Sequence, residues 1–365
     1  MPGNTNLNFC LEDNIDFSGR SLTCYGGITN YYGTFDGNGF TLSNFSIYSV
    51  DGDANSVGLV NINRGTIRNL NFENCLINVN DVTNLGFIAG INYGEIINCS
   101  VVNCTINCEQ QDDVEECRAI GLMTGVNDDG IVSNCLVYDS QNTNDYSIYA
   151  VSHFYEAGFG TCYLSVGGLT GKMYGGEINN CMVYGVKLYS VVLHEAAFMS
   201  VTPYQFVCGL AGYVYENIAY LNNCISIAEY GGEKYLITMD GNRNTDSDRK
   251  FYGGLAGWLG PVNFCNCYVG LPYGEEFVAG NVFVYIDGTH EFLGAEFSMQ
   301  ILPEAFASWQ SNSEHIISPC YSVALCEYLS SKIWVWVVTV AILVLFLGVG
   351  ICEYIFAVKY KRHVR

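Results

Sequence analysis

The chain has 365 residues, of which 50% are apolar, and it contains 40 Gly and 27 Tyr but only 6 Pro. Aromatic and β-branched residues in this amount exclude a disordered chain, and residues that favour strands and turns argue against a helical bundle. The formal net charge is −21. So acidic a body would repel a phosphate backbone, and no nucleic-acid partner is expected.

Residues 1–50 precede a series of repeats and are assigned as a leading segment. The first residues, MPGNTNLNFCLED, have neither a basic start nor an apolar run, so no signal peptide is predicted. Three explanations stay open. The chain is a mature or truncated form, its start is assigned too late, or it is a tail-anchored protein whose residues 1–331 face the cytosol.

A glycine-containing phrase occurs six times between residues 51 and 270. Each copy has a short apolar stretch with glycines, a turn, and a second apolar stretch that in most copies ends in Asn-Cys. The copies are VGLVNINRGTIRNL from Val57, LGFIAGINYGEIINC from Leu85, IGLMTGVNDDGIVSNC from Ile120, VGGLTGKMYGGEINNC from Val166, VCGLAGYVYENIAYLNNC from Val207 and YGGLAGWLGPVNFCNC from Tyr252. The closing positions of the glycine phrase are assigned to Ile62, Gly90, Gly125, Gly171, Gly212 and Gly257.

The phrase predicts three short strands per repeat. The apolar residues around the glycines form one strand, the alternating residues after the turn form a second, and stretches such as 71–77 and 101–106 form a third. Short strands in repeated units favour an all-β, right-handed parallel β-helix, in which strands of successive coils pair at about 4.8 Å. One coil cannot bury its inner face alone, so the array is cooperative.

Stacking of the repeats predicts two columns of identical side chains. We expect the first column to point into the core, where small apolar thiols fit well. The second column lies at a turn and can form hydrogen bonds along the stack. The first column contains Leu70, Cys99, Cys135, Cys181, Cys224 and Cys267, and the second contains Asn69, Asn98, Asn134, Asn180, Asn223 and Asn266.

The phrases GGLTG, CGLAG and GGLAG resemble the GLUG motif of repetitive surface proteins from bacteria and some parasitic protists. The segments NFCLEDNIDFSG (8–19) and YYGTFDGNGFTLSNFSI (31–47) are similar to the leader of these proteins, so the resemblance covers about residues 6–270. It implies a β-helical, adhesin-like module without family-defining catalytic residues. Ile62 departs from the motif, and a membrane helix replaces the signals of the bacterial relatives, as in single-span protist surface proteins.

Three Tyr-rich insertions, residues 138–165, 184–206 and 227–251, separate the later repeats. Long loops on a rigid scaffold commonly carry recognition, and Tyr offers a large contact area at low entropic cost. These insertions are therefore the expected binding surface. The alternative is that they form extra strands or a partial coil of the solenoid.

The C-terminus contains the clearest single signal. Residues Ile333–Cys352 form a run of 20 residues without a charge, long enough to span the hydrocarbon core of a bilayer. The basic tail KYKRHVR follows, and the positive-inside rule places it in the cytoplasm.

We divide the chain into a leader that caps the solenoid and holds the first coil (1–50), repeats with insertions (51–270), a C-terminal coil or cap with a membrane-proximal segment (271–332), a transmembrane helix (333–358) and a tail (359–365). Residues 297–310 are expected to close the open end of the solenoid.

The remaining cysteines and the asparagine sequons suggest covalent modifications. Three pairs lie close together in turn-rich segments and are predicted disulfides. They are Cys10 with Cys24, Cys108 with Cys117, and Cys320 with Cys326. Asn44, Asn98 and Asn103 begin glycosylation sequons. Asn98 belongs to the asparagine column and is expected to be inaccessible, so Asn44 and Asn103 are the candidate sites if the body is translocated.

No catalytic or metal-binding motif is recognised. No Cys/His cluster has the spacing of a metal site, and no cofactor is expected. The carboxylates Asp36, Asp128, Asp129 and Glu177 form no clustered set of the kind that glycoside hydrolysis requires.

The sequence therefore predicts a surface-displayed binding protein that is not an enzyme. It is expected to be a single-pass cell-membrane protein with an extracellular body, which binds an extracellular protein or glycan as an adhesin does. A β-helical carbohydrate-active enzyme, a structural coat protein and a cytosol-facing scaffold are the alternatives.

Overall fold

The computed structural model divides the chain into two units, residues 1–318 and 319–365. The residues that the structure describes all belong to the first unit. They are residues 5–18, 20–22, 28–48, 55–109, 118–139, 146–154, 160–194, 201–214, 219–222, 224–227, 237–241, 250–253, 256–259, 262–265, 268–270 and 279–282. The predicted membrane helix, the tail and the segment 297–310 lie outside them. No helix of the described residues is long and apolar enough to cross a membrane.

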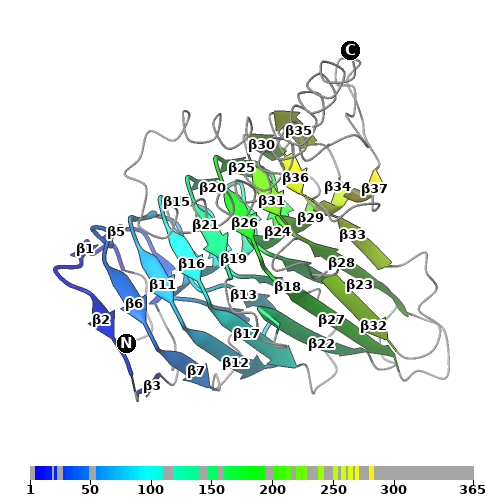
Figure 1. Ribbon diagram of the computed structural model, residues 1–365, viewed down its shortest axis with the longest axis horizontal. Coiled ribbons are helices and arrows are strands. Elements are labelled where there is room, and N and C mark those ends of the chain that lie inside the picture. Colours follow the sequence, from blue (N-terminus) through cyan, green and yellow to red (C-terminus); the bar gives the residue numbers. More distant parts are fainter. Residues whose placement is uncertain are drawn as a thin grey trace, which may run out of the picture. The chain divides into compact units, whose positions relative to one another are not determined.

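The described part is a parallel β-helix, in which each full coil contributes one strand to each of five sheets (Figure 1). Sheet A contains β4 (Ile28–Tyr31), β9 (Val60–Asn63), β14 (Ala89–Asn92), β19 (Thr124–Asp128), β24 (Thr170–Tyr174), β29 (Ala211–Val214), β34 (Ala256–Leu259) and β37 (Ala279–Val282). Sheet B contains β1 (Phe9–Cys10), β5 (Thr34–Asp36), β10 (Thr66–Arg68), β15 (Glu95–Ile97), β20 (Ile131–Ser133), β25 (Gly176–Asn179), β30 (Ala219–Asn222) and β35 (Val262–Cys265).

The other three sheets continue each coil in the order C, D, E. Sheet C contains β2 (Ile15–Asp16), β6 (Thr41–Ser43), β11 (Asn71–Glu73), β16 (Ser100–Val102), β21 (Leu136–Tyr138), β26 (Met182–Tyr184), β31 (Ile225–Ile227) and β36 (Tyr268–Gly270). Sheet D contains β3 (Ser21–Leu22), β7 (Ser46–Tyr48), β12 (Leu76–Asn80), β17 (Thr105–Glu109), β22 (Ile148–Phe154), β27 (Leu188–His194) and β32 (Ile237–Gly241). Sheet E contains β8 (Ser56–Val57), β13 (Asn84–Leu85), β18 (Arg118–Gly121), β23 (Gly160–Gly167), β28 (Val201–Cys208) and β33 (Lys250–Gly253).

The predicted parallel solenoid is confirmed, but the expected three strands per repeat are wrong, because a full coil has five. The apolar stretch around the glycines is two strands, one in sheet E and one in sheet A, separated by a bend. The stretch 71–77 is likewise split between sheets C and D. Asn74 breaks it by adopting a φ of 54°, a left-handed conformation that Asn tolerates better than most residues.

Asparagine turns the chain at two corners of the coil. Between sheets B and C, the column residues Asn69, Asn98, Asn134 and Asn180 have φ values of 53°, 53°, 54° and 52°. Between sheets C and D, Asn44, Asn74 and Asn103 have φ values of 58°, 54° and 51°. The recurrence of Asn thus reflects a backbone requirement as well as hydrogen bonding along the stack.

The closing glycine of the repeated phrase permits a close approach between sheets A and E. A Cβ atom on Gly171 in β24 would lie 2.3 Å from the backbone nitrogen of Ile120 in β18, and one on Gly125 would lie 2.5 Å from that of Leu85. The register pairs Ala89 with Val60 and Ile91 with Ile62. The counterpart of Gly90 in the first copy of the repeated phrase is therefore Asn61, and the assignment of Ile62 to this position is wrong. Among the described strands sheet E begins at β8, so none of them lies beside Asn61 in the way that β8 lies beside Gly90.

The core is a continuous apolar interior with a buried polar ladder along sheet A. Asn63, Asn92 and Asn127 are fully buried. The amide of Asn63 donates to the side-chain oxygen of Asn92, and the amide of Asn92 donates to that of Asn127, each over 2.7 Å. Each amide also donates to a backbone carbonyl at or just after the turn: Asn63 to Glu95, Asn92 to Gly94 and Asn127 to Gly130. This ladder satisfies the polar groups of the turn between sheets A and B from inside the solenoid.

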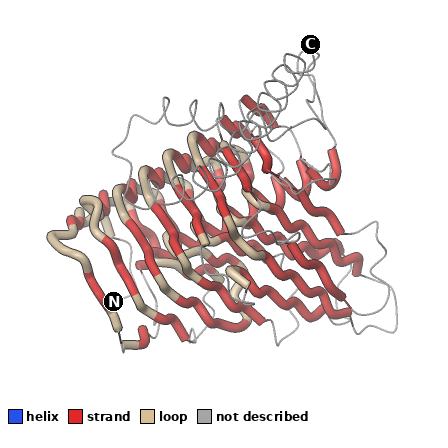
Figure 2. Tube along the Cα trace, viewed as in Figure 1, coloured by secondary structure: helices blue, strands red, loops and turns tan. Residues whose placement is uncertain are grey.

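Parts of the insertions are strands that lengthen sheets D and E, so the insertions are not loops throughout. β22 and β27 are each seven residues long, compared with five in β17 of the same sheet, and β23 and β28 each have eight residues, compared with four in β18. These strands pair in register along their length. The loop interpretation of the insertions is therefore corrected in favour of extra strand length (Figure 2). The reason is that backbone hydrogen bonds of the added residues extend the existing sheets.

Candidate binding surface

Three tyrosines from the insertions form a cluster on the outer face of sheet D, which we call the tyrosine cluster. Tyr149 in β22 and Tyr189 in β27 are direct neighbours in register. Their rings stack with centroids 5.1 Å apart and an interplanar angle of 7°. Tyr146 lies 4.6 Å from the ring of Tyr189 and 6.5 Å from that of Tyr149. Stacked and offset rings at these distances stabilise each other.

The tyrosine cluster points outward because strands alternate their side chains between the two faces. Ile148 and Ala150 flank Tyr149 and are fully buried in the interior, whereas Tyr149 itself is 37% exposed. Its column in sheet D continues towards the N-terminal coils through Asn107, Asn78 and Tyr48. The cluster is therefore an aromatic patch that is separated from Tyr48 by two coils with Asn in this column.

Two acidic groups lie a short way along the strand or chain from the tyrosine cluster, because Glu109 pairs in register with Val151, two residues after Tyr149, and Asp139 contacts Ser147, which follows Tyr146. Glu109 ends β17, and one of its carboxylate oxygens lies 3.8 Å from Nε2 of His153 in β22. The hydroxyl of Ser147 donates to a carboxylate oxygen of Asp139 over 2.5 Å. The patch combines ring surfaces and hydroxyl groups with a polar, acidic border, which suits contact with a polar ligand.

A second aromatic group, formed by three rings from the insertions and two from the repeated phrases, lies on the outer faces of sheets E and A. Phe206 and Tyr213 are buried, and Tyr163, Tyr174 and Tyr204 pack against them. The ring of Tyr163 lies 5.3 Å from that of Tyr213 at an angle of 21°. Two of these rings are inaccessible, so this group holds the two sheets together and the tyrosine cluster is the more open aromatic surface.

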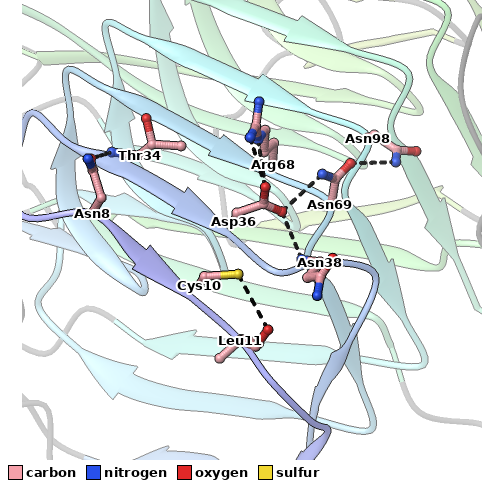
Figure 3. Close-up of polar contacts among 9 residues, drawn as sticks. All are labelled: Asn8, Cys10, Leu11, Thr34, Asp36, Asn38, Arg68, Asn69 and Asn98. Atoms are coloured by element: carbon pink, nitrogen blue, oxygen red, sulfur yellow. Dashed lines mark hydrogen bonds and ion pairs between the residues drawn. The ribbon is translucent and has the colours of Figure 1, made fainter.

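The asparagine column forms a hydrogen-bonded ladder that starts at an ion pair (Figure 3). The amide of Asn98 donates to Asn69 over 2.8 Å, and the amide of Asn69 donates to Asp36 over 3.0 Å. Arg68 forms a 2.9 Å ion pair with Asp36. Burial raises the pKa of the Asp36 carboxyl, but the hydrogen bonds from Asn69 and Asn38 and the charge of Arg68 outweigh it, so the pKa is lowered overall.

Further along this column the amide of Asn180 donates to Asn134 over 3.2 Å. The predicted ladder is thus observed in two parts, Asn69 with Asn98 and Asn134 with Asn180. It is interrupted between them, because the buried side-chain oxygen of Asn98 accepts no hydrogen bond. Asn223 and Asn266 lie outside the described residues. The first coil is closed in a related way, because the side-chain oxygens of Asn8 and Asn14 accept hydrogen bonds from the backbone of Thr34 and Thr41.

The inward cysteine column is also observed. Cys99, Cys135, Cys181 and Cys224 are fully buried free thiols, and Cys267 lies outside the part of the chain that the structure describes. Burial raises the pKa of the Cys99 and Cys181 thiols well above the ordinary value, so these thiols stay neutral. A second pair of inward cysteines, Cys75 and Cys104, follows Asn74 and Asn103 at the corner between sheets C and D. Each of the two cysteines is 2% exposed. Sequence reasoning missed this pair, although Asn-Cys recurs there in NFENC and VVNC.

The predicted modification sites fall in different environments. Cys10 is an exposed free thiol and Cys108 is a buried one; their predicted partners, Cys24 and Cys117, lie outside the described residues, as do Cys320 and Cys326, so all three disulfides stay predictions. Asn44 is exposed and donates its amide to Asp16 over 2.9 Å. Asn103 is half-buried.

Three of the four carboxylates considered for catalysis have identified partners. Asp36 pairs with Arg68, Glu177 accepts a hydrogen bond from Asn179, and Asp128 interacts with Tyr93 and contributes to the raised pKa of its hydroxyl after the larger effect of burial. Asp36 and Glu177 lie four coils apart in sheet B, or roughly 19 Å at the usual strand spacing. Within the described ranges no group of three or more His, Cys, Asp or Glu side chains could hold a metal ion.

Comparison with known proteins yields one structural likeness. No protein-family model matches the sequence, and no curated protein matches it. The structure is similar to the crystal structure of a putative immunoglobulin A1 protease from Bacteroides ovatus, with a TM-score of 0.48 and 16% sequence identity over 73% of this chain and 69% of that chain.

Proposed function

We propose that the chain is a surface-displayed binding protein of the GLUG-motif type, with an adhesin-like role. In this proposal a right-handed parallel β-helix is held at the cell membrane by the segment 333–358, and its ligand is an extracellular protein or glycan. The tyrosine cluster carries the proposal. It is an open aromatic surface contributed by insertions and absent from the corresponding positions of the two preceding coils, where the column has Asn78 and Asn107.

The chemistry of the tyrosine cluster supports contact with a polar macromolecule. Tyrosine combines an apolar ring with a hydroxyl tip and has few rotatable bonds, so contacts to it cost little conformational entropy. The strands β22 and β27 pair over seven residues, which fixes the positions of Tyr149 and Tyr189 before a ligand arrives. Such preorganisation improves affinity by lowering the entropic cost of binding.

The binding role predicts a loss of attachment when the cluster is removed. Replacing Tyr149 and Tyr189 with Ser should reduce attachment of beads that display the protein to host cells or matrix by tenfold or more, since central aromatic anchors contribute about 2 kcal/mol or more each. Tyr48→Ser is the matched control, because Tyr48 occupies the same outer column and is 43% exposed. Unchanged attachment by a folded double variant would contradict the proposed surface.

The membrane arrangement predicts protection of the C-terminal tail. Protease added to intact cells should cleave before Lys332 and leave the sequence KYKRHVR protected, because the basic tail favours the cytoplasmic side. Mass spectrometry of the released and cell-bound peptides measures this. A body that is cleaved only after the cells are permeabilised would support the cytosol-facing arrangement instead.

A further inference from the structure

The two coils that precede the tyrosine cluster present a polar surface directly beside it. In sheet D, Asn107 in β17 is the register neighbour of Tyr149, and Asn78 in β12 is the register neighbour of Asn107 (Figure 1). Glu109 lies on the same outer face as Asn107, because strand residues two apart point the same way. Cys108, which lies between them, is 1% exposed and belongs to the core. We call Tyr149, Asn107, Asn78 and Glu109 the sheet D site.

One face of the Tyr149 ring is open towards this polar surface. The parallel stack with Tyr189 in the next coil, with ring centroids 5.1 Å apart, covers the opposite face. Tyr146 lies nearer the other end of the stack, because its ring centroid is 4.6 Å from that of Tyr189 and 6.5 Å from that of Tyr149. Tyr149 is 37% exposed, and its remaining ring face therefore points towards the coil of Asn107.

The polar side chains of the sheet D site are available to a ligand. Asn63 and Asn92 are register neighbours inside the solenoid, and their side chains are joined by a hydrogen bond of 2.7 Å. Asn78 and Asn107 are register neighbours as well, but neither side chain forms a hydrogen bond in the part of the chain that the structure describes. Asn78 is exposed and Asn107 half-buried. The side chain of Glu109 is 52% exposed, so the site offers two carboxamides and a carboxylate beside an open ring.

We propose that the sheet D site binds a neutral glycan, with one sugar against Tyr149 and the next over Asn107 and Asn78. This inference rests on the binding role proposed for the tyrosine cluster and names the class of its ligand. The C–H groups on one face of a hexose carry partial positive charge, so they pack well against the negative face of an aromatic ring. Sugar hydroxyls both donate and accept hydrogen bonds, as carboxamides do, and the carboxylate of Glu109 can accept hydrogen bonds from two adjacent hydroxyls.

The dimensions and charge of the sheet D site favour a neutral glycan over other ligands. Two strand spacings separate Tyr149 from Asn78, about 10 Å, which is close to the length of a disaccharide. The net charge of −21 and the carboxylate of Glu109 disfavour an acidic glycan or a phosphate. The strands β12, β17 and β22 each have a paired strand on both sides, so an extended peptide finds no strand edge with which to form main-chain hydrogen bonds.

Chemical treatment of the target surface tests the class of ligand. Periodate cleaves the vicinal diols of sugars and leaves peptide bonds intact, so attachment of beads that display the full chain should fall by about tenfold or more, as on loss of a central anchor. Sialidase, which removes only acidic terminal sugars, should leave attachment unchanged. If attachment survives periodate but is lost in the Tyr149→Ser, Tyr189→Ser double variant, the glycan inference is overturned and the proposed binding role stands. Attachment that resists both changes contradicts the binding role itself, and attachment lost with sialidase overturns the assignment to a neutral glycan.

Direct binding measures the part played by Asn107. Neutral oligosaccharides released from the same target surface should bind the full chain in saturation-transfer NMR. The dissociation constant should rise about fivefold in Asn107→Ala, as expected for the loss of one hydrogen bond. Tyr48→Ser is the matched control and should bind like the wild type, because Tyr48 lies three strand spacings from Tyr149, about 14 Å. With circular dichroism showing every variant folded, the absence of binding to the wild type, or equal binding by Asn107→Ala, would overturn the proposed site.

Discussion

Replacing Cys181 with Asp should lower the free energy of unfolding by several kcal/mol. The thiol of Cys181 is fully buried and donates towards the backbone carbonyls of Asn179 and Val132, over 3.3 Å and 3.6 Å. A carboxylate in this place can only accept hydrogen bonds, so it would face two carbonyl oxygens without a donor. An unpaired buried charge costs about 3 kcal/mol or more. Urea unfolding followed by circular dichroism measures the loss.

Two comparisons separate charge burial from other effects of this substitution. Cys181→Ala removes the sulfur without adding a charge and should cost only about 1–2 kcal/mol, as a small cavity does. Cys10→Asp, at an exposed thiol, should change stability by less than about 0.5 kcal/mol. A Cys181→Asp variant as stable as the wild type would contradict the inward placement of the cysteine column.

The destabilisation by Cys181→Asp should also depend on pH. Burial disfavours the charged form, so the pKa of the new carboxyl is raised in the folded state above its unfolded value of about 3.9. A group of this kind loses its contribution to stability as the pH rises through the folded pKa. The difference in stability from the wild type should therefore be large at pH 7 and become smaller towards pH 4.

The columns of the solenoid could be predicted from the sequence because each coil repeats the same local rule. The pair Asn98 and Cys99 recurs in later coils. The Asn adopts a left-handed conformation and the Cys fills the core, so the two requirements together produce a recognisable Asn-Cys dipeptide. The partition of each coil into five strands could not be predicted in the same way. Strands of two or three residues are too short to show a period, and the breaks between them depend on contacts with the coils above and below.

The insertions show where sequence reasoning lacks the necessary information. Tyr149 and Tyr163 lie in stretches that resemble polar surface loops in composition, yet both belong to strands that pair with the neighbouring coil. The length of a strand in a stack depends on whether the next coil also extends, which is a non-local property. The buried ladder of Asn63, Asn92 and Asn127 was missed for a related reason, since an isolated Asn close to a Gly also fits an ordinary turn.

Gly171→Ala should destabilise the solenoid by about 3 kcal/mol or more, at the upper end of overpacking effects. The added Cβ would lie 2.3 Å from the nitrogen of Ile120, 2.6 Å from the carbonyl carbon of Ala119 and 2.8 Å from the oxygen of Gly125. All three atoms belong to the backbone, so no side-chain rotation can relieve the contact. Relief requires that sheets A and E move apart, and the paired strands on both sides oppose this movement.

The first copy of the repeated phrase offers the matched control for this glycine. Asn61 occupies the register position of Gly90 in β14, below the point where sheet E begins among the described strands. Asn61→Ala should therefore change stability by less than about 0.5 kcal/mol, as surface substitutions usually do. If thermal unfolding finds Gly171→Ala as stable as the wild type, the close approach of sheets A and E is not what requires the glycine. The repeated phrase would then need another explanation, such as recognition of its backbone by a partner.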